Sequence, residues 1–392
     1  MKTLREIDVT GKRVLVRVDF NVPMSDAGEV TDDLRIQMAL PTITYLLEKK
    51  AKIILCTHLG RPKGQKVATY SLAPVAEYLA GLLAEQVKLA PDCIGPEVEA
   101  LVSAMEPGDI IMLENVRFHQ QEVENDPQFS EQLSRLADVY VNDAFAVSHR
   151  AHASVVGVAG CVAIKAPGLL LQKELDYFRR SCAEPQRPFV AIVGGAKVSG
   201  KLEALENMLD RVDRLILGGA MANTFLKGQG YDVGASKVED DLLETANTLL
   251  AKAKAKGVKV YLPVDVVAAE TFAPDAVSKH VTIQDIPEAW MALDIGPASV
   301  LCFEEALADA KTIVWNGPMG AFEMDAFSRG TMAIAHCVAT SHALSVTGGG
   351  DSNAAIKKSG EAANISYMST GGGAFLMLME GKQLPGVVGL SD

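Results

Sequence analysis

The sequence predicts an α/β protein with two doubly wound parallel-sheet domains joined by a helix. Short apolar runs rich in β-branched residues alternate with longer segments of helical period, which is typical of successive βαβ units. The runs are apolar nearly throughout rather than alternating, as in parallel strands that are buried on both faces. The chain has 392 residues, more than one ordinary core accommodates, so we expect two domains of about 200 residues each.

Each predicted strand is located by the start of its apolar run. The runs begin near Val14, Ile53, Ile110, Val139, Val190, Leu215, Val260, Ile313, Leu344 and Ile365. Parallel strands need crossover connections, and the segments 201–210 and 241–256 have the helical period that suits this role. Right-handed crossovers then produce doubly wound sheets.

A helix from Leu169 to Arg180 is predicted to connect the two domains. It follows Pro167-Gly168, and Pro185 comes after its end, so start and stop signals flank it. The predicted domains are residues 1–168 and 184–379, with residues 169–183 as the inter-domain helix. The tail, residues 380–392, contains a helix breaker and is too short to be a domain, so we expect it to dock on another part of the chain.

Charge and composition restrict the class of partner and the compartment. The net charge of -12 argues against nucleic acid, whose phosphate backbone calls for a broad basic surface. No apolar run reaches the ~20 residues of a membrane helix, and the start of the chain lacks the apolar stretch of a signal peptide. The six cysteines show no C-x-x-C pair and no zinc spacing, so we expect buried free thiols. A cytoplasmic protein without a membrane partner is the prediction.

The residues that follow the predicted strands differ between the two halves of the chain. Charged and polar residues follow them in the first half, whereas glycine runs follow them in the second, at 194–195, 218–219, 348–350 and 371–373. Ligands of open α/β sheets bind beyond the carboxyl ends of the strands. We therefore expect the first domain to present fixed donors and positive charge, and the second to present bare backbone.

Seven residues of the first half are candidates for binding an acidic substrate. Arginine suits bidentate binding of carboxylate and phosphate, and the repeated placement of these residues just past strand ends favours a joint site over separate surface ion pairs. They are Asp19, Asn21, Arg35, His58, Arg61, Arg117 and Arg150. We interpret the neighbouring His149 as structural.

The segment from Gly195 to Lys201 is a candidate phosphate site, because it follows a strand and is predicted to open a helix. Lys197 and Lys201 would add mobile positive charge. The segment nearly matches the P-loop motif, but Leu202 stands where that motif needs a Mg²⁺-binding hydroxyl, so the P-loop interpretation fails. A glycine turn with two solvated lysines remains the alternative.

Two further glycine runs lie between a strand and a helix. In Gly348-Gly349-Gly350-Asp351-Ser352, the glycines allow close approach of a ligand, and Asp351 suits a hard cation that bridges phosphate oxygens. Ser352 could instead cap the following helix. The run 369–374 is either a third backbone nest or a flexible hinge.

Spacing indicates no catalytic triad and no metal-ligating histidine pair. This is consistent with direct phosphoryl transfer, in which catalysis consists of positioning and charge neutralisation.

At these residues the sequence resembles the phosphoglycerate kinase family. The motifs occur in the family's order over nearly the whole chain, and the ordered set is far more specific than any single glycine run. They are Arg17–Pro23, His58–Pro62, Glu114–His119, Asn142–Phe145, His149–His152, Gly194–Val198, Trp315–Gly320, Gly348–Asp351 and Ser369–Gly373.

The resemblance implies a monomeric, hinge-closing enzyme of glycolysis and gluconeogenesis that transfers a phosphoryl group in line between 1,3-bisphosphoglycerate and ADP, giving 3-phosphoglycerate and ATP. The seven residues of the first domain would bind the phosphoglycerate, and the tail would dock on that domain. Arg35 and Lys197 would meet the phosphoryl group in flight, with the helix end at Gly372 and Gly373. The nucleotide and its Mg²⁺ would bind in the second domain, with Asp351 on the metal. The implied nucleotide-binding residues are Lys197, Lys201, Gly218, Glu323, Gly349, Gly350, Asp351 and Ser352.

A few positions depart from the family's pattern. Ser352 stands where threonine is usual and keeps the hydroxyl, and Phe375 and Met377 stand where a small polar residue and an acid are frequent. Two other hypotheses have their own sequence requirements. A nucleotide-binding protein without catalysis would predict damage at Arg35, Lys197, Lys201 or Asp351, and all four are intact. A dinucleotide-dependent dehydrogenase would need G-x-G-x-x-G after an early strand, where Asp19-Phe20-Asn21 stands instead.

Overall fold

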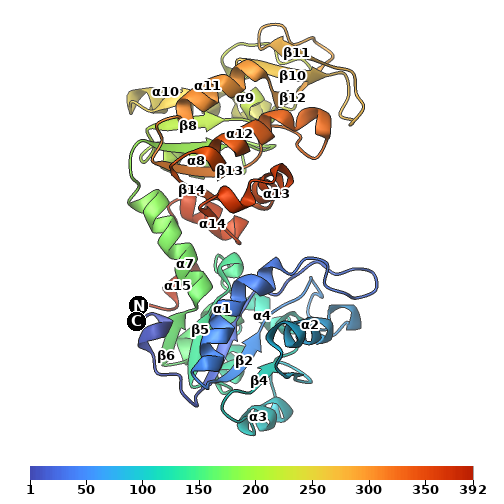
Figure 1. Cartoon of the computed structure of the whole chain (residues 1–392), viewed down its shortest axis with the longest axis vertical. Helices are drawn as coiled ribbons and strands as arrows, with labels where there is room; N and C mark the ends of the chain where they lie inside the picture. The colour runs from blue at the N-terminus through green and yellow to red at the C-terminus, as the bar shows by residue number, and fades with distance from the viewer. Residues whose placement is uncertain (392) are drawn as a thin grey trace. The chain divides into compact units, whose positions relative to one another are not determined.

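The computed structural model describes residues 1–391, which form two compact units. Unit 1 contains residues 1–175 and the C-terminal segment from residue 383, and unit 2 contains residues 176–382. Figure 1 shows a sheet with flanking helices in each unit. The division falls inside α7 (Leu169–Phe178), which starts where the sequence predicts and is followed by a π-helical turn, Arg179–Ala183. The predicted domain assignments stay predictions. The last residue of the predicted tail, Asp392, lies outside the described residues.

Unit 1 is built on a parallel six-stranded sheet of order β3-β4-β2-β1-β5-β6. Its strands are β1 (Arg13–Arg17), β2 (Lys52–Cys56), β3 (Val87–Leu89), β4 (Ile110–Met112), β5 (Val139–Asn142) and β6 (Ile164–Pro167). Its helices, besides the first part of α7, are α1 (Leu34–Glu48), α2 (Ala73–Leu83), α3 (Pro96–Ser103), α4 (Gln121–Glu124), α5 (Pro127–Ser134), α6 (Val158–Cys161) and α15 (Pro385–Val388). Arg17 pairs with Cys56 and with Asn142, so three chain segments leave the sheet together at its carboxyl edge.

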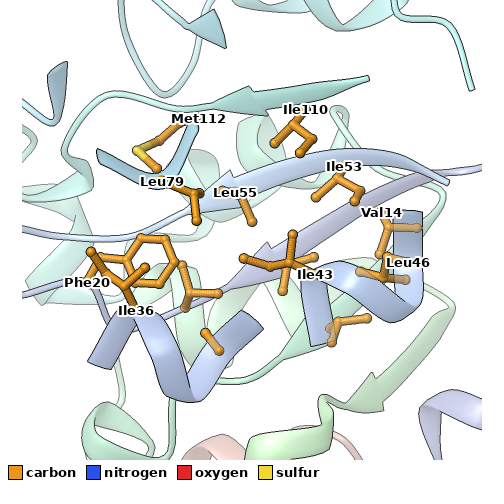
Figure 2. Close-up of a cluster of buried hydrophobic side chains, with 14 of the residues drawn as sticks. Val14, Phe20, Ile36, Ile43, Leu46, Ile53, Leu55, Leu79, Ile110 and Met112 are labelled. Atoms are coloured by element: carbon orange, nitrogen blue, oxygen red, sulfur yellow. The ribbon is translucent and has the colours of Figure 1, made fainter. Parts of the chain in front are cut away.

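The core of unit 1 lies between the sheet and the helices that cover it. Helix α1 places Ile36, Ile43 and Leu46 on one face, with the spacing of an amphipathic helix, and all three are fully buried. Figure 2 shows these side chains packed against strand residues such as Val14 and Ile53. Burial of each such side chain contributes about 1.5–3 kcal/mol, which fixes α1 and therefore the loop that precedes it.

Unit 2 contains a second parallel sheet, of order β15-β14-β13-β7-β8-β9. Its strands are β7 (Phe189–Val193), β8 (Arg214–Leu217), β9 (Lys259–Tyr261), β13 (Thr312–Asn316), β14 (Leu344–Thr347) and β15 (Tyr367–Met368). Its helices are α8 (Leu202–Met208), α9 (Met221–Gly228), α10 (Leu243–Ala255), α11 (Pro297–Leu307), α12 (Arg329–Thr340), α13 (Gly350–Ser359) and α14 (Gly372–Met379). The predicted α/β class with two doubly wound parallel sheets is confirmed.

The apolar pattern does not reveal every strand. Besides β3 and β6, it misses an antiparallel sheet in unit 2, formed by β10 (Asp265–Ala269), β11 (Ser278–Thr282) and β12 (Met291–Ile295). Strand β11 reads Ser-Lys-His-Val-Thr and is mostly exposed, so it carries no apolar run. As a short edge strand with one apolar residue, β11 is held by its antiparallel pairing with β10, and its own sequence gives no apolar signal.

Two further sequence predictions meet the structure here. All six cysteines are free, but Cys161 is exposed and only Cys56, Cys93 and Cys182 are buried, so the expectation of burial is wrong for Cys161. The helix α6 ends at Cys161, and this final position points away from the core. Within residues 1–391, no helix has both the length and the apolar character needed to cross a membrane.

Candidate functional site

One cavity of unit 1 brings together all seven residues that the sequence predicts to bind an acidic substrate. The cavity has a volume of about 190 Å³, and Gly60, Ala146 and Val147 complete its lining. The seven residues come from loops that follow β1, β2, β4 and β5 and from the first turn of α1. Because these strands are parallel, their carboxyl ends meet at one edge of the sheet.

Hydrogen bonds fix the polar groups around this cavity. Arg35 Nη1 donates to Asp19 Oδ2 at 2.7 Å, which holds the guanidinium at the start of α1. The N–H of Gly60 donates to Asn21 Oδ1 at 2.8 Å, and Arg117 Nη1 donates to the carbonyl of Gly60 at 2.8 Å. The backbone at Gly60 thus links the loops that follow three different strands.

The cavity is strongly electropositive. Four arginines line it, and Asp19 is the acidic residue among its lining residues. Burial, followed by the charges of Arg17 and Arg150, lowers the pKa of Arg117 to about 10. Burial and the surrounding arginines hold the pKa of His58 well below its ordinary value, so His58 is neutral at pH 7. An anion that entered would compensate charges that repel one another.

A buried polar network supports the residues of the cavity, and its members are not among the seven site residues that the sequence predicts. Arg17, at the end of β1, is only 1% exposed and donates from Nε to Ser154 Oγ at 2.8 Å and from Nη1 to the carbonyl of Val18. Ser154 Oγ donates to Glu122 Oε1 at 2.6 Å, and Glu122 is fully buried. Arg17 opens one of the recognised motifs, but nothing in the sequence pairs it with Glu122, which is 105 positions away (122 − 17).

Two histidines flank Arg150, and one of them, His152, has its Nδ1 3.7 Å from Glu122 Oε1 of this network. His149 Nε2 accepts a hydrogen bond from Arg150 Nε at 3.2 Å. Burial and the charge of Arg150 lower the pKa of His149, while burial and neighbouring arginines lower that of His152 to about 4. Both histidines are therefore neutral at pH 7, and His149 orients Arg150, in agreement with its structural interpretation.

In unit 2, the glycine runs that follow the strands contact one another. Asn316, the last residue of β13, donates from Nδ2 to the carbonyl of Gly348 at 2.7 Å. A Cβ placed on Gly317, where φ is +101°, would lie 2.2 Å from the carbonyl oxygen of Gly194. A Cβ on Gly372 would lie 3.1 Å from the Cα of Gly349. The absence of side chains therefore allows the loops after β7 and β13, and those after β14 and β15, to pack backbone against backbone.

Lys201 lies among these loops. Its ammonium donates to the carbonyls of Gly194 and Asn316 at 2.6 and 2.8 Å. Burial lowers the pKa of Lys201 to about 8, and the nearby Asp351 carboxylate acts in the opposite direction. The expectation that the segment 195–201 opens a helix holds only at its end, because α8 begins at Leu202 and a loop separates it from β7.

Lys197 is exposed on that loop, and a distant carboxylate fixes the loop beside it. Glu239 accepts hydrogen bonds from the N–H groups of Val198 and Ser199 at 2.5 and 3.1 Å and from the Ser199 hydroxyl at 2.5 Å. The sequence gives no signal for Glu239, since it is 42 positions after Lys197 (239 − 197) and belongs to no motif.

Ser352 does not cap α13, so that alternative is wrong. The helix begins at Gly350 with Gly349 as the N-cap residue, and Ser352 lies within the first turn. Its buried hydroxyl accepts a hydrogen bond from the N–H of Gly317 at 2.6 Å and donates to the carbonyl of Gly348 at 3.0 Å. Ser352 thus connects the loop after β13 with the glycine run after β14.

The start of α13 fits a nucleotide-bound magnesium ion. Asp351 is exposed in the first turn, and nothing lies within 4 Å of a Cβ built on Gly350. Mg²⁺ in nucleotide sites takes one or two carboxylates together with phosphate oxygens and water, and Asp351 supplies such a carboxylate. Glu323 lies near the other end of this helix, where Lys358 Nζ donates to the carbonyls of Phe322 and Glu323 at 3.0 and 3.4 Å.

Gly372 and Gly373 are the first two residues of α14, so their N–H groups lie at the positive end of a helix. The departure at Phe375 concerns packing. Phe375 is buried, contacts Phe178 edge-on with 6.4 Å between ring centroids, and covers Gly348, where a Cβ would lie 2.2 Å from its ring. Gly218 packs in the same way against the sulfur of Met319.

Comparison with known families agrees with this geometry. The family model "Phosphoglycerate kinase" matches residues 4–382. The chain belongs to the phosphoglycerate kinase family. Among its relatives, the phosphoglycerate kinase of Desulfotalea psychrophila is 66% identical over 387 residues and covers 99% of each chain. That of Citrifermentans bemidjiense is 58% identical over 394 residues, which is 100% of this chain and 99% of the relative.

Solved phosphoglycerate kinases have the same fold. The enzyme from Coxiella burnetii superposes with a TM-score of 0.93 at 44% identity, covering 99% of this chain and 98% of that one. The enzyme from Pyrococcus horikoshii OT3 superposes with a TM-score of 0.84 at 32% identity, covering 100% and 98%. Membership of the phosphoglycerate kinase family excludes the dinucleotide-dependent dehydrogenase.

Proposed function

We propose that this chain catalyses the reversible transfer of a phosphoryl group between 1,3-bisphosphoglycerate and ADP, giving 3-phosphoglycerate and ATP. The observation that carries the proposal is the convergence of seven motif residues, four of them arginines, on one cavity of unit 1. A substrate with one phosphate and one carboxylate has the negative charge that this cavity compensates. We further propose that the enzyme acts as a cytoplasmic monomer.

In this proposal the residues of the cavity bind the phosphoglycerate. Arg61, Arg117 and Arg150 bind its phosphate and carboxylate groups, because their guanidinium forks match both anions. Asp19 accepts a hydrogen bond from its hydroxyl group, and the amide of Asn21 and the neutral His58 donate to its oxygen atoms. Arg35, held by Asp19, contacts the transferred group.

The loops of unit 2 bind the nucleotide. Lys201 and the N–H groups of Gly349 and Gly350 contact its phosphates, and Ser352 keeps these loops in register. The backbone of Gly218 contacts the nucleotide, and Glu323 binds the ribose. Asp351 holds the Mg²⁺ of the nucleotide, which neutralises charge on the phosphate oxygens.

Transfer in this proposal is direct. A carboxylate oxygen of 3-phosphoglycerate attacks the γ-phosphorus of ATP in line, the bond to the β,γ-bridging oxygen breaks, and ADP leaves. Lys197, Arg35 and the N–H groups of Gly372 and Gly373 stabilise the charge on the equatorial oxygens. Because the two substrates bind to different units, transfer requires the units to bring them together.

A coupled assay tests the proposal. Purified protein receives ATP, Mg²⁺ and 3-phosphoglycerate, and glyceraldehyde-phosphate dehydrogenase reports the acyl phosphate as loss of NADH. We expect turnover that disappears when 3-phosphoglycerate or Mg²⁺ is omitted, and that falls in Arg35→Ala but not in a surface control, Arg135→Ala. Absence of turnover in protein that still binds ATP would favour the alternative, a nucleotide-binding protein without catalysis.

A further inference from the structure

Three side chains of types that bind metal ions meet in unit 1. None of them is among the residues assigned to the substrate or the nucleotide. Asp92 and Cys93 lie on the loop after β3, and His119 follows the 3₁₀ turn Val116–Phe118 after β4. One ligand atom of each residue lies within 4.8 Å of the ligand atoms of the other two. Among residues 1–391, these three side chains form the one group of at least three His, Cys, Asp or Glu residues whose ligand atoms lie this close together.

The backbone holds the two loops in register. The N–H of Ala90 donates to the carbonyl of Met112 at 2.8 Å. The N–H of Glu114 donates to the carbonyl of Asp92 at 3.3 Å. These hydrogen bonds continue the β3–β4 pairing past the strand ends. The three side chains are therefore brought together by the sheet, and their approach does not depend on a mobile connection.

The side chains have the arrangement of a partly open metal site. Cys93 is fully buried, whereas the side chains of His119 and Asp92 are 24% and 38% exposed. Asp92 Oδ1 accepts a hydrogen bond from the N–H of Cys93 at 2.6 Å and lies 2.7 Å from His119 Nε2. The His119 ring also packs against Phe129, with 5.3 Å between centroids. Backbone and ring contacts of this kind orient ligands in metal sites.

We propose that Asp92, Cys93 and His119 bind a divalent transition metal ion such as Zn²⁺, with solvent as the fourth ligand. Thiolate, imidazole and carboxylate are the ligands that Zn²⁺ prefers in proteins, and three protein ligands with one open position form a common tetrahedral set. Ligand atoms around such an ion lie roughly 3.5 Å apart, so side-chain rotations bring the three donors into position. Binding releases the thiol proton of Cys93 to solvent.

The site differs from the magnesium site in its chemistry. Sulfur and nitrogen ligands discriminate against Mg²⁺, which takes oxygen ligands. His119 also lines a second cavity, of about 260 Å³. Arg61, Arg117 and Arg150 line both this cavity and the substrate cavity. A metal ion on His119 would therefore lie beside the residues that are proposed to bind phosphoglycerate.

Cobalt spectroscopy on the full-length chain tests the proposal, which does not depend on the proposed function. Co²⁺ is titrated without nucleotide and with excess Mg²⁺, which occupies sites made of oxygen ligands. We expect one Co²⁺ per chain, visible d–d bands of tetrahedral coordination, a thiolate-to-metal charge-transfer band, and displacement by Zn²⁺. Absence of the charge-transfer band would overturn the proposal.

Matched variants show which residues bind the metal. Cys93→Ser should abolish the charge-transfer band. The side chain of His119 is partly exposed, so His119→Gln should keep the fold, as circular dichroism checks, and weaken Co²⁺ binding at least tenfold. Cys161→Ser removes the exposed cysteine and His336→Gln an exposed histidine, and both should leave the spectrum unchanged. Loss of the signal in either control, or its persistence in both Cys93→Ser and His119→Gln, would show that metal binds elsewhere.

Discussion

Arg17 donates a hydrogen bond to His58 in the wall of the anion cavity, with 3.1 Å between Arg17 Nη2 and His58 Nδ1. A guanidinium has no acceptor, so His58 Nδ1 must be unprotonated, and the proton of the neutral imidazole lies on Nε2. Asp19 Oδ1, at 3.8 Å from the same nitrogen, is beyond hydrogen-bond distance. Arg17 therefore determines which nitrogen of His58 donates to a ligand.

Replacing Arg17 with lysine should impair phosphoglycerate binding more than nucleotide binding. An ammonium keeps the charge but cannot reproduce the guanidinium geometry that contacts Ser154, Val18 and His58. One hydrogen bond to a charged group contributes about 1.5–3 kcal/mol, so we expect KM for 3-phosphoglycerate to rise about tenfold or more. Steady-state kinetics with each substrate varied in turn measures this. Arg13→Lys, on the same strand but in a partly exposed ion pair, serves as control, and equal effects in the two variants would contradict the prediction.

Arg35→Ala and Lys197→Ala should each lower turnover by roughly 10²–10³-fold, the effect of losing one preorganised charge-stabilising donor. The two cations come from different units, and each is fixed by a carboxylate, Arg35 directly by Asp19 and the Lys197 loop by Glu239. The coupled assay at saturating substrate measures kcat. A loss of less than about threefold in either variant would remove that residue from the mechanism, and Lys252→Ala, in a surface ion pair, should have no effect.

Gly168→Ala should change kcat without weakening the binding of either substrate. A Cβ at Gly168 would lie 2.1 Å from Asp143 Oδ1, so the start of α7 must shift. Asp143 accepts hydrogen bonds from the N–H groups of Leu170 and Leu171 at 2.9 and 3.2 Å, and the shift disturbs both. Conformational steps often limit turnover, so we expect kcat to fall while calorimetric Kd values remain unchanged. Gly160→Ala, with nothing within 4 Å of its Cβ, is the control, and unchanged kcat in Gly168→Ala would refute the role of this helix start.

Two buried carboxyl groups, those of Asp143 and Asp294, should contribute less to stability as pH rises from about 4 to about 7. Burial raises the pKa of Asp143 and that of Asp294 to about 7, although backbone N–H groups oppose the shift. A carboxyl group with a raised pKa binds more protons in the folded state, so its contribution is complete below the unfolded pKa and disappears as pH passes the folded value. Each pKa unit corresponds to ~1.4 kcal/mol, so the change amounts to a few kcal/mol per group.

Histidines with lowered pKa values change the unfolding free energy in the opposite direction over this pH range. Asparagine variants isolate the contribution of the two carboxyl groups. We expect Asp143→Asn and Asp294→Asn each to reduce the pH dependence of the unfolding free energy in urea between pH 4 and 7, relative to wild type. The exposed Asp275→Asn should leave the curve unchanged. Identical curves for wild type and both buried variants would contradict the prediction.

Ser352→Ala should destabilise unit 2, whereas Ser352→Thr should not. Alanine leaves the buried N–H of Gly317 without its partner, which costs about 1–3 kcal/mol, and threonine keeps the hydroxyl. Urea unfolding and ATP binding of both variants measure the difference. Ser359→Ala is the control, because the Ser359 hydroxyl makes only local hydrogen bonds, to the carbonyl of Ile356 at 2.8 Å and from the N–H of Glu361 at 3.4 Å. A Ser352→Ala variant as stable as this control would show that the hydroxyl does not connect the loops.

The sequence by itself determined the class of fold, most strands of the two parallel sheets and the residues of the anion cavity. It did so because buried parallel strands are continuous apolar runs, and because the carboxyl ends of such strands meet at one edge, so the residues that follow them converge. Asp19, His58 and Arg117 are grouped by the sequence alone. The glycine runs of unit 2 were predictable for the same reason.

Only the tertiary structure decided which buried polar groups support these residues. Arg17, Ser154 and Glu122 come from three separate segments, and their mutual distances depend on strand order and register, which no local pattern encodes. Glu239 beside Lys197, and His119 beside Asp92 and Cys93, depend on side-chain contacts between segments that are distant in sequence. Burial then sets the protonation of Lys201, Asp143 and His58, because the pKa of a side chain responds to the solvent and charges around it in the folded chain.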